Sequence, residues 1–413
     1  MEKKELNNII CCLIAWISIR IIFLSKFPIG YDSTHFLKVA RDCSLNGRFL
    51  YDIGCIIGDK ALPLFIFISS LLIPVIFYYI CRSYCSQNSS LLATILISIS
   101  PFMFYQTQYN FIDKNVFEII FILINYYNLL CEKNIYKSML ISLITLSIFF
   151  YVWEGAILLF ALISKLYLLR LIIEKKYLTA MALWGAIGLF ILIEFNKIIE
   201  YIIYFLHSQD KTIISEMISP LFLGFKLEYL LFIFIFLMLL YEIPNILKIL
   251  SVTSLLMFLV AYRLNIFLIP IIYISIALFI DKFRLKGIGL VFIIFLLISG
   301  TATYTSKTFI DDDYLIAMKY LNDSNKNCII SLWQNGHALK YYTDKEVYYY
   351  ATSENLEGQL GVLVYEGKTD CSIFFTKKDL DSLKYIVPKI SVNDYWIIRN
   401  IGLFHKFGDN YVL

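Results

Sequence analysis

Long apolar stretches follow one another along most of the chain, separated by short polar segments. Each is about 15 to 20 residues long, near the lower limit for a helix that crosses the hydrocarbon core of a bilayer. The pattern predicts a polytopic α-helical membrane protein with about eleven transmembrane helices. The apolar stretches lie at residues 8–24, 62–81, 90–109, 113–131, 137–153, 155–173, 177–195, 227–241, 245–261, 264–281 and 286–303.

The pattern changes at about residue 304, where continuous hydrophobicity gives way to turn residues and charges. The segments CIISLW, EVYYYA and CSIFF have the composition of strands, whereas DDDYLIAMKYLND and KKDLDSLKYIV have helical spacing. We therefore expect a transmembrane domain over residues 1–303 and a small mixed α/β domain over residues 304–413. The sequence contains no internal repeat of the kind found in many transporters.

Composition excludes several classes of protein. Charged residues make up 16% of the chain, against about 25% in soluble domains, so a soluble globule is excluded. A net charge of +4 without a clustered basic patch gives no support for nucleic-acid binding. The nine cysteines show neither zinc-site spacing nor a readable disulfide framework; Cys43 and Cys55 share one loop and could be a disulfide or two free thiols.

Basic residues alternate between the two ends of the predicted spans. Lys and Arg collect in one set of short connections, whereas the long segments 25–61, 196–226 and 304–413 belong to the other set. By the positive-inside rule the basic set is cytoplasmic. This predicts a multi-pass cell-membrane protein with a cytoplasmic N-terminus, an uncleaved signal anchor and an extracytoplasmic C-terminal domain.

Three acidic residues lie on three different outer segments: Asp32, Asp113 and Glu216. Each taken alone could be a solvated loop acid, but three converging carboxylates would suit a hard cation such as Mg²⁺ or Mn²⁺. Arg263, just outside a late span, could bind a phosphate in a bidentate manner or could snorkel to the interface. His207 could likewise contact phosphate or metal, or be a solvated loop histidine.

Several short motifs accompany these residues in a fixed order. Asp32 begins a segment with His35, Phe36, Ala40, Arg41 and Asp42; a second has Asn110, Phe111 and Asp113; a third has Ile213, Ile214, Ser215 and Glu216. Arg263 follows in AYRLNIFLIP, and Ser331, Leu332, Trp333, Gln334, Asn335, Gly336 and His337 follow a predicted strand. Together they resemble the catalytic subunit of oligosaccharyltransferase, of the single-subunit archaeal and bacterial type, over nearly the whole chain.

The resemblance implies roles for particular residues. Asp32 and Glu216 would be catalytic, and Asp32, Asp113 and Glu216 would hold Mg²⁺ or Mn²⁺. Arg263 would bind the donor phosphate. Trp333, Gln334 and Asn335 would bind the acceptor, in the part of the family signature that holds a Ser or Thr hydroxyl.

The sequence also departs from the family pattern. Asn115 stands where the second motif usually has an acid or a histidine, so it would be a weaker metal ligand. Leu332 and Gln334 replace a Trp and an Asp of the signature, which removes a charge-assisted hydrogen bond. Asp381 and Lys384 match a further helix motif weakly, because such pairs are common on helix surfaces.

The function implied is transfer of a glycan from a polyprenyl phosphate or diphosphate to Asn in an Asn-x-Ser/Thr acceptor at the outer face. Residues 1–303 would then be the catalytic domain, in contact with membrane lipids, a lipid-linked donor and an acceptor polypeptide, within a single-subunit enzyme. One alternative is another lipid-phosphate-sugar glycosyltransferase that acts on a hydroxyl or lipid acceptor, and the altered signature favours it. A degenerate family member is a further alternative, and a transporter or flippase is the third.

Overall fold

The computed structural model describes residues 3–23, 31–43, 49–107, 109, 112–152, 156–193, 231, 233–239, 244–260, 265–283, 287–304, 310–350, 371–377 and 405–412. The chain forms two compact units. The first comprises Met1–Phe23, Phe67–Thr107 and Lys114–Ser306. The second comprises Leu24–Ile66, Gln108–Asp113 and Lys307–Leu413.

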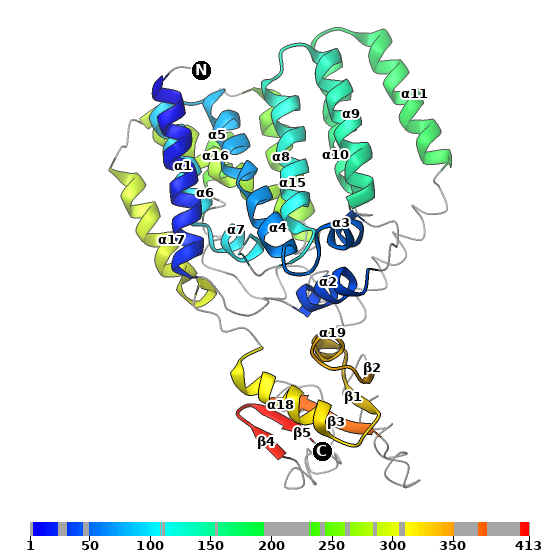
Figure 1. The fold of residues 1–413 in the computed structure, drawn as a ribbon. Helices are drawn as coiled ribbons and strands as arrows, with labels where there is room; N and C mark the ends of the chain where they lie inside the picture. The colour runs from blue at the N-terminus through cyan, green and yellow to red at the C-terminus, as the bar shows by residue number, and fades with distance from the viewer. Residues whose placement is uncertain are drawn as a thin grey trace, which may run out of the picture. The chain divides into compact units, whose positions relative to one another are not determined.

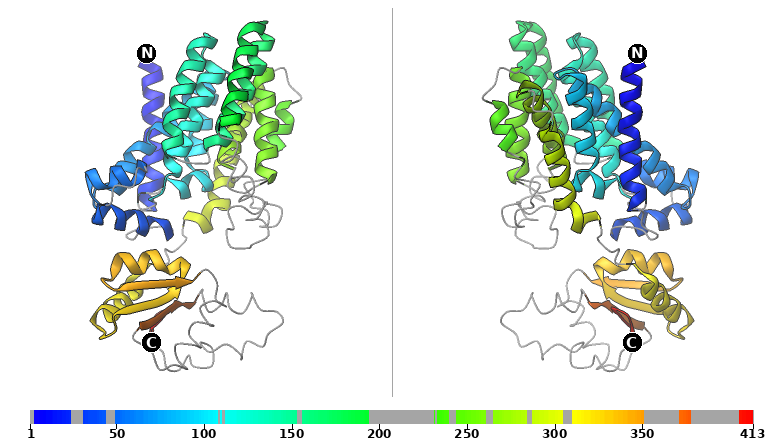
Figure 2. Two further views of the ribbon diagram at one scale, coloured as in Figure 1. Left: turned by 90° about the vertical axis from the view of Figure 1, so that its right-hand side faces the viewer. Right: turned by 90° about the vertical axis from the view of Figure 1, so that its left-hand side faces the viewer.

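The first unit is helical, and its long helices run roughly parallel or antiparallel to one another (Figures 1 and 2). Each predicted apolar stretch contains at least one helix, which confirms the helical prediction. The helices are α1 (Lys3–Ile22), α5 (Leu72–Arg82), α6 (Gln87–Ser98), α7 (Pro101–Gln106), α8 (Asn115–Cys131), α9 (Ile135–Val152), α10 (Ala156–Ile173), α11 (Tyr177–Ile193), α14 (Ile233–Leu239), α15 (Asn245–Val260), α16 (Asn265–Phe283) and α17 (Ile288–Tyr304), with α4 (Leu62–Ser70) running from the second unit into the first.

Four apolar segments of the described chain are long enough to cross a membrane by length and composition: Lys3–Ile22, Leu62–Arg82, Ile135–Val152 and Ile266–Phe283. Shorter apolar helices include Asn115–Cys131, Asn245–Leu256 and Gly289–Gly300. Helix α16 is the most enclosed of the four long segments, with 72% of its span buried. It packs against α5, α6, α8, α14 and α15, which explains why it is apolar on all sides.

Two of the predicted stretches are interrupted. Residues 90–109 contain α6 and α7, because Pro101 cannot continue α6 and instead begins α7. The Ser100 side chain caps α7 by accepting a hydrogen bond from the Met103 backbone N–H at 3.4 Å. The stretch 62–81 contains α4 and α5, which meet at Leu71, three residues before Pro74.

Arg20 interrupts the first apolar stretch, and its environment explains how the charge is tolerated. The side chain is 1% exposed and lies 3.4 Å from the centroid of the Trp16 ring. Its guanidinium donates to Thr107 Oγ1 at 2.9 Å and to the carbonyl oxygens of Ser98 and Met103 at 3.2 and 3.4 Å. These bonds offset the cost of burying the charge and fix the end of α7.

The second unit contains a five-stranded sheet within its described residues, in the order β2-β1-β3-β5-β4. The central strand β1 (Cys328–Leu332) is parallel to β2 (Glu346–Tyr350) and to β3 (Cys371–Thr376). Strand β5 (Asn410–Val412) is antiparallel to β3 and to β4 (His405–Phe407). The prediction of a small mixed α/β domain near the C-terminus is confirmed, with β1, β2 and β3 in the three expected segments.

Helices α18 (Asp312–Asp323) and α19 (Trp333–Tyr342) share one hydrophobic core with this sheet (Figure 1). The core includes Tyr314 from α18, Leu339 from α19 and Phe374 from β3, all fully buried. The Asp311 side chain caps α18 by accepting a hydrogen bond from the Tyr314 backbone N–H at 2.8 Å. The second predicted helix, KKDLDSLKYIV, lies almost entirely outside the described residues.

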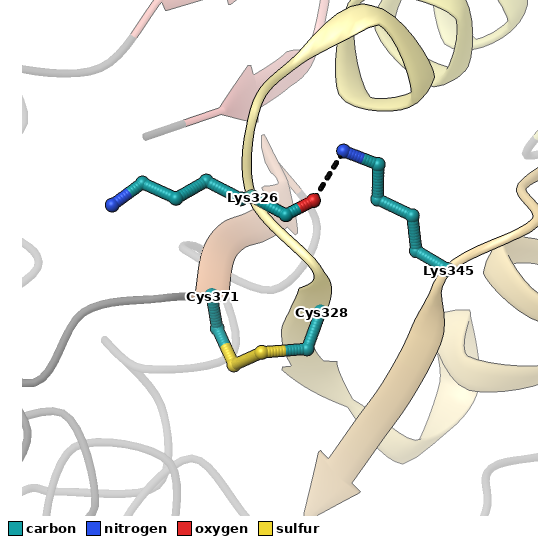
Figure 3. Close-up of a disulfide and its surroundings, with 4 residues drawn as sticks. All are labelled: Lys326, Cys328, Lys345 and Cys371. Atoms are coloured by element: carbon teal, nitrogen blue, oxygen red, sulfur yellow. Dashed lines mark hydrogen bonds between the residues drawn. A yellow bond between two sulfur atoms is a disulfide. The ribbon is translucent and has the colours of Figure 1, made fainter.

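A disulfide joins Cys328 and Cys371, the first residues of the paired strands β1 and β3 (Figure 3). The Lys345 ammonium group reaches the same end of β1 and donates to the Lys326 carbonyl oxygen and to the Ser324 carbonyl oxygen. The N-terminal end of β1 is therefore held by the disulfide and by the hydrogen bonds of Lys345. Cys43 and Cys55 are free thiols.

Candidate active site

The segment that carries Asp32 folds as an amphipathic helix, α2 (Tyr31–Asp42), in the second unit. Asp32 is its second residue, a position at which the helix dipole favours an acid. The buried residues Ser33, Thr34, Leu37 and Ala40 recur at helical spacing and form its inner face. Helix α3 (Phe49–Ile57) packs closely on this face: a Cβ atom at Gly54 would lie 2.9 Å from the Ala40 Cβ.

A buried hydrogen bond links α2 to the segment that carries Asp113. Ser33 Oγ accepts from the Ile112 backbone N–H at 2.8 Å, and the two residues are 1% and 0% exposed. Ser33 follows Asp32 in the chain and Ile112 precedes Asp113, so this bond holds the two acidic positions on adjacent segments. Ser33 could not be identified as a link from the sequence, because nothing around it indicates a partner 79 residues away.

The described residues contain no group of three or more His, Cys, Asp or Glu side chains placed to hold a metal ion. Asp32 and Asp113 lie on adjacent segments, and carboxylate oxygens are the ligands that a hard divalent cation prefers; that these two residues hold such a cation stays a prediction. Glu216 lies outside the described residues. Asn115 begins α8 in the first unit, and its side-chain amide donates to Gln106 Oε1.

The altered signature lies at the turn from β1 into α19. Helix α19 begins at Trp333, directly after β1, so Trp333 and Gln334 are the first two helical residues at the carboxyl end of a parallel strand. Asn335 is 1% exposed and its Nδ2 donates to Ser331 Oγ at 3.2 Å. Ser331 Oγ in turn donates to the Phe374 carbonyl oxygen at 2.8 Å. This chain of bonds fixes the start of α19 on the sheet; the assignment of Asn335 to the acceptor pocket stays a prediction.

Helix α19 packs against α2 within the second unit. The His35 and His337 rings lie 4.4 Å apart between centroids, and His35 Nε2 shares a hydrogen bond with the Tyr51 hydroxyl at 2.9 Å. Burial, together with the neighbouring His35 and with Lys340, lowers the pKa of His337 to about 4. His337 is therefore neutral at pH 7, so its contact with His35 does not place two positive charges side by side.

Arg41 makes the second contact between these helices. Its Nη1 donates to the Tyr341 carbonyl oxygen at 3.0 Å, and its guanidinium carbon lies 4.1 Å from the centroid of the Tyr341 ring. Its Nε lies 3.4 Å from Asp59 Oδ2, which also accepts from the Tyr341 hydroxyl at 3.5 Å. The sequence places Arg41 only within a motif and does not reveal a partner 300 residues away.

Arg263, His207, Asp381 and Lys384 lie outside the described residues. Asp32 lies in the first turn of α2, and Trp333 and Gln334 lie in the first turn of α19. What the structure brings together in one unit is therefore the segment of Asp32, the segment of Asp113 and the start of α19.

Comparisons with known proteins show a family and a fold. Residues 57–229 match the family described as Oligosaccharyl transferase STT3, N-terminal. A search of curated proteins gave no match.

Solved structures of the Archaeoglobus fulgidus oligosaccharyltransferase share the fold. The apo form has a TM-score of 0.63 at 11% identity, and the similarity covers 92% of this chain and 70% of that one. The form tethered to an acceptor peptide with the NVT sequon has 0.62 at 11%, covering 91% and 69%. The archaeal enzyme AglB with an inhibitory peptide and a dolichol-phosphate has 0.61 at 12%, covering 92% and 70%.

The described helices and sheet define a helical membrane protein with a small α/β domain near its C-terminus. Within that class, the family match and the shared fold confirm the resemblance to the catalytic subunit of oligosaccharyltransferase that the motifs predict.

Proposed function

We propose that this protein transfers a glycan from a polyprenyl phosphate or diphosphate to the side-chain amide of Asn in an Asn-x-Ser/Thr acceptor. The observation that carries the proposal is the presence, in one compact unit, of α2 with Asp32, the segment of Asp113 and helix α19, which packs against α2. The family match over residues 57–229 supports the same reaction. None of these observations favours a hydroxyl or lipid acceptor.

The chemical difficulty of this reaction is the acceptor amide, whose nitrogen is a poor nucleophile because its lone pair is delocalised into the carbonyl. Two carboxylates that accept both N–H hydrogens orient the nitrogen and weaken that delocalisation. We assign these roles to Asp32 and Glu216. The position of Asp32 in the first turn of a helix that packs against α3 and α19 supports this assignment.

A divalent cation is the expected cofactor. The archaeal relative has a structure in complex with Zn and sulfate, which is consistent with a divalent site. In this chain Asp32, Asp113 and Glu216 would hold Mg²⁺ or Mn²⁺, with Asn115 as a weaker oxygen donor. When bound, the cation neutralises negative charge on the departing phosphate.

Donor and acceptor are held by other residues. Arg263 binds the donor phosphate, with His207 as a lesser candidate for the same group. Trp333, Gln334 and Asn335 receive the acceptor's Ser or Thr hydroxyl at the start of α19. Asp381 and Lys384 are lesser candidates for the same pocket. The partners are a polyprenyl-linked glycan, an acceptor polypeptide and membrane lipids.

We further propose the topology that the basic residues predict: about eleven spans within a catalytic domain of residues 1–303, a cytoplasmic N-terminus and an extracytoplasmic domain over residues 304–413. The disulfide between Cys328 and Cys371 supports the outer location of this domain, because disulfides persist in oxidising compartments. The enzyme is proposed to act as a single subunit.

The function is tested with the purified chain, a polyprenyl-diphosphate-linked glycan and a fluorescent Asn-x-Thr peptide. We expect a glycopeptide whose glycan is attached to the Asn side-chain nitrogen, as located by fragmentation mass spectrometry. A peptide with Gln in place of Asn is the matched control and should remain unmodified. A product glycosylated on a hydroxyl or on a lipid, without transfer to Asn, would move the protein to the alternative class of glycosyltransferase.

A further inference from the structure

Two of the side-chain contacts between helices α2 and α19 stand out because of their spacing. On α19 the contacts come from His337 and Tyr341, which are four residues apart and therefore lie on one face of the helix. On α2 they come from His35 and Arg41, nearly two turns apart. Contacts at two separated points fix both the distance between two helices and their relative rotation, which a single contact cannot do.

The Arg41 contact fixes the far end of α19. The Tyr341 carbonyl oxygen lies in the last turn of this helix, where carbonyl groups have no partner within the helix. Arg41 supplies a charged donor to that oxygen at 3.0 Å, and the helix dipole favours a cation at this end. Burial raises the pKa of the Tyr341 phenol, so its hydroxyl stays protonated and donates to Asp59.

The magnitude of the Arg41 contact argues for positioning rather than for stability. The Arg41 side chain is 45% exposed, and ion pairs at that exposure contribute about 0 to 1 kcal/mol. The unit is stabilised mainly by its buried core, which does not include Arg41. What Arg41 does contribute is geometry, since its guanidinium touches the backbone and the ring of Tyr341 and the carboxylate of Asp59 together.

The proposed catalytic and acceptor-binding residues lie at the N-terminal ends of α2 and α19, away from the Arg41 contact. Asp32 is in the first turn of α2, and Trp333 and Gln334 are in the first turn of α19. We propose that Arg41 and His337 are positioning residues, which hold α19 against α2 so that the hydroxyl pocket and the Asp32 carboxylate act on the same acceptor peptide. This inference rests on the proposed function. It assigns acceptor selectivity partly to residues that do not touch the acceptor.

The test compares transfer to two peptides that differ only at the second residue after Asn, Thr in one and Ala in the other. In Arg41→Ala we expect kcat/KM for the Thr peptide to fall about 10-fold and the preference for Thr over Ala to fall towards 1. The KM for the lipid-linked donor should not change. Arg41→Lys, which can still donate to the Tyr341 carbonyl oxygen, should retain most of the preference.

The matched control is Lys38→Ala, on the same helix, whose ammonium group pairs with Asp42 at 3.2 Å. This variant should have the wild-type kcat/KM for the Thr peptide and the wild-type preference for Thr over Ala. His337→Gln is a second variant for the same interface, and it should lose the preference for Thr even if Arg41→Ala does not fold. Thermal unfolding of each variant shows which of them are folded.

Three outcomes would count against the proposal. Equal losses for the Thr and Ala peptides in folded Arg41→Ala and His337→Gln would reduce these residues to a structural role. Unchanged transfer in both variants would remove any role for them. If the wild-type chain transfers no glycan to either peptide, the proposed function fails and the positioning role fails with it. If the wild-type chain transfers glycan and the variants keep its preference for Thr over Ala, the positioning role alone is overturned.

Discussion

Replacement of Asp32 or Asp113 by Asn should reduce glycan transfer by at least about 100-fold, the range found when a residue that stabilises transition-state charge is removed. Asn keeps the size of the side chain and removes its negative charge, so folding should be preserved. The double variant should be about as active as the less active of the two single variants, because groups that act as one unit fail together. Initial rates with a fluorescent acceptor peptide measure all three.

The matched control is Asp323→Asn, an exposed acid at the end of α18 that should leave transfer unchanged. Chelation of divalent cations should abolish wild-type transfer, and Mg²⁺ or Mn²⁺ should restore it. Transfer that persists at the wild-type rate in either Asp variant, or under chelation, would contradict a metal held by these carboxylates.

Loss of the disulfide is expected to have the largest effect on stability. The bond joins residues separated by 43 positions, and the chain-entropy estimate for a loop of that length is about 4 kcal/mol. Replacing Cys328 and Cys371 together by Ser should therefore lower the unfolding free energy of the second unit markedly. Limited proteolysis at increasing denaturant concentration reports this directly, because the opened domain is cleaved first.

Replacement of Cys11, an exposed free thiol on α1, by Ser is the control and should leave the denaturation curve unchanged. In intact cells both Cys328 and Cys371 should resist alkylation until a reductant is added. Alkylation of both thiols without reductant would instead place the domain in a reducing compartment and contradict the proposed topology.

The sequence predicts the helices of the first unit well, because an apolar stretch that faces lipid has few alternatives to a helix. Its predictions of helix continuity were less accurate. The sequence predicts one span over residues 90–109, but Pro101 divides this stretch into α6 and α7. The role of Arg20 could not be predicted either, since its partners come from two later helices that hydropathy does not place beside α1.

The sequence identifies the motifs of the candidate site, but it does not predict how their residues are arranged in space. The positions of Asp32 and Asp113 were identified from their outer location, but the bond from Ile112 to Ser33 depends on tertiary packing. The pairing of Cys328 with Cys371 was likewise unreadable, because spacing does not reveal that β1 and β3 are neighbours. His337 was recognised as part of a signature, whereas its contact with His35 follows from the approach of α2.

The acceptor peptide series tests the central claim most directly, since it asks whether the altered signature still recognises a hydroxyl two residues after Asn. Gln334 offers a neutral hydrogen bond in place of one to a carboxylate, and losing a neutral hydrogen bond costs about 0.5 to 1.5 kcal/mol. Peptides with Ser or Thr should therefore react roughly 2- to 13-fold faster than the Ala peptide, and Trp333→Ala should reduce this preference. Transfer to Asn that ignores the position and is unaffected by Trp333→Ala, or no transfer to any Asn peptide, would contradict the account.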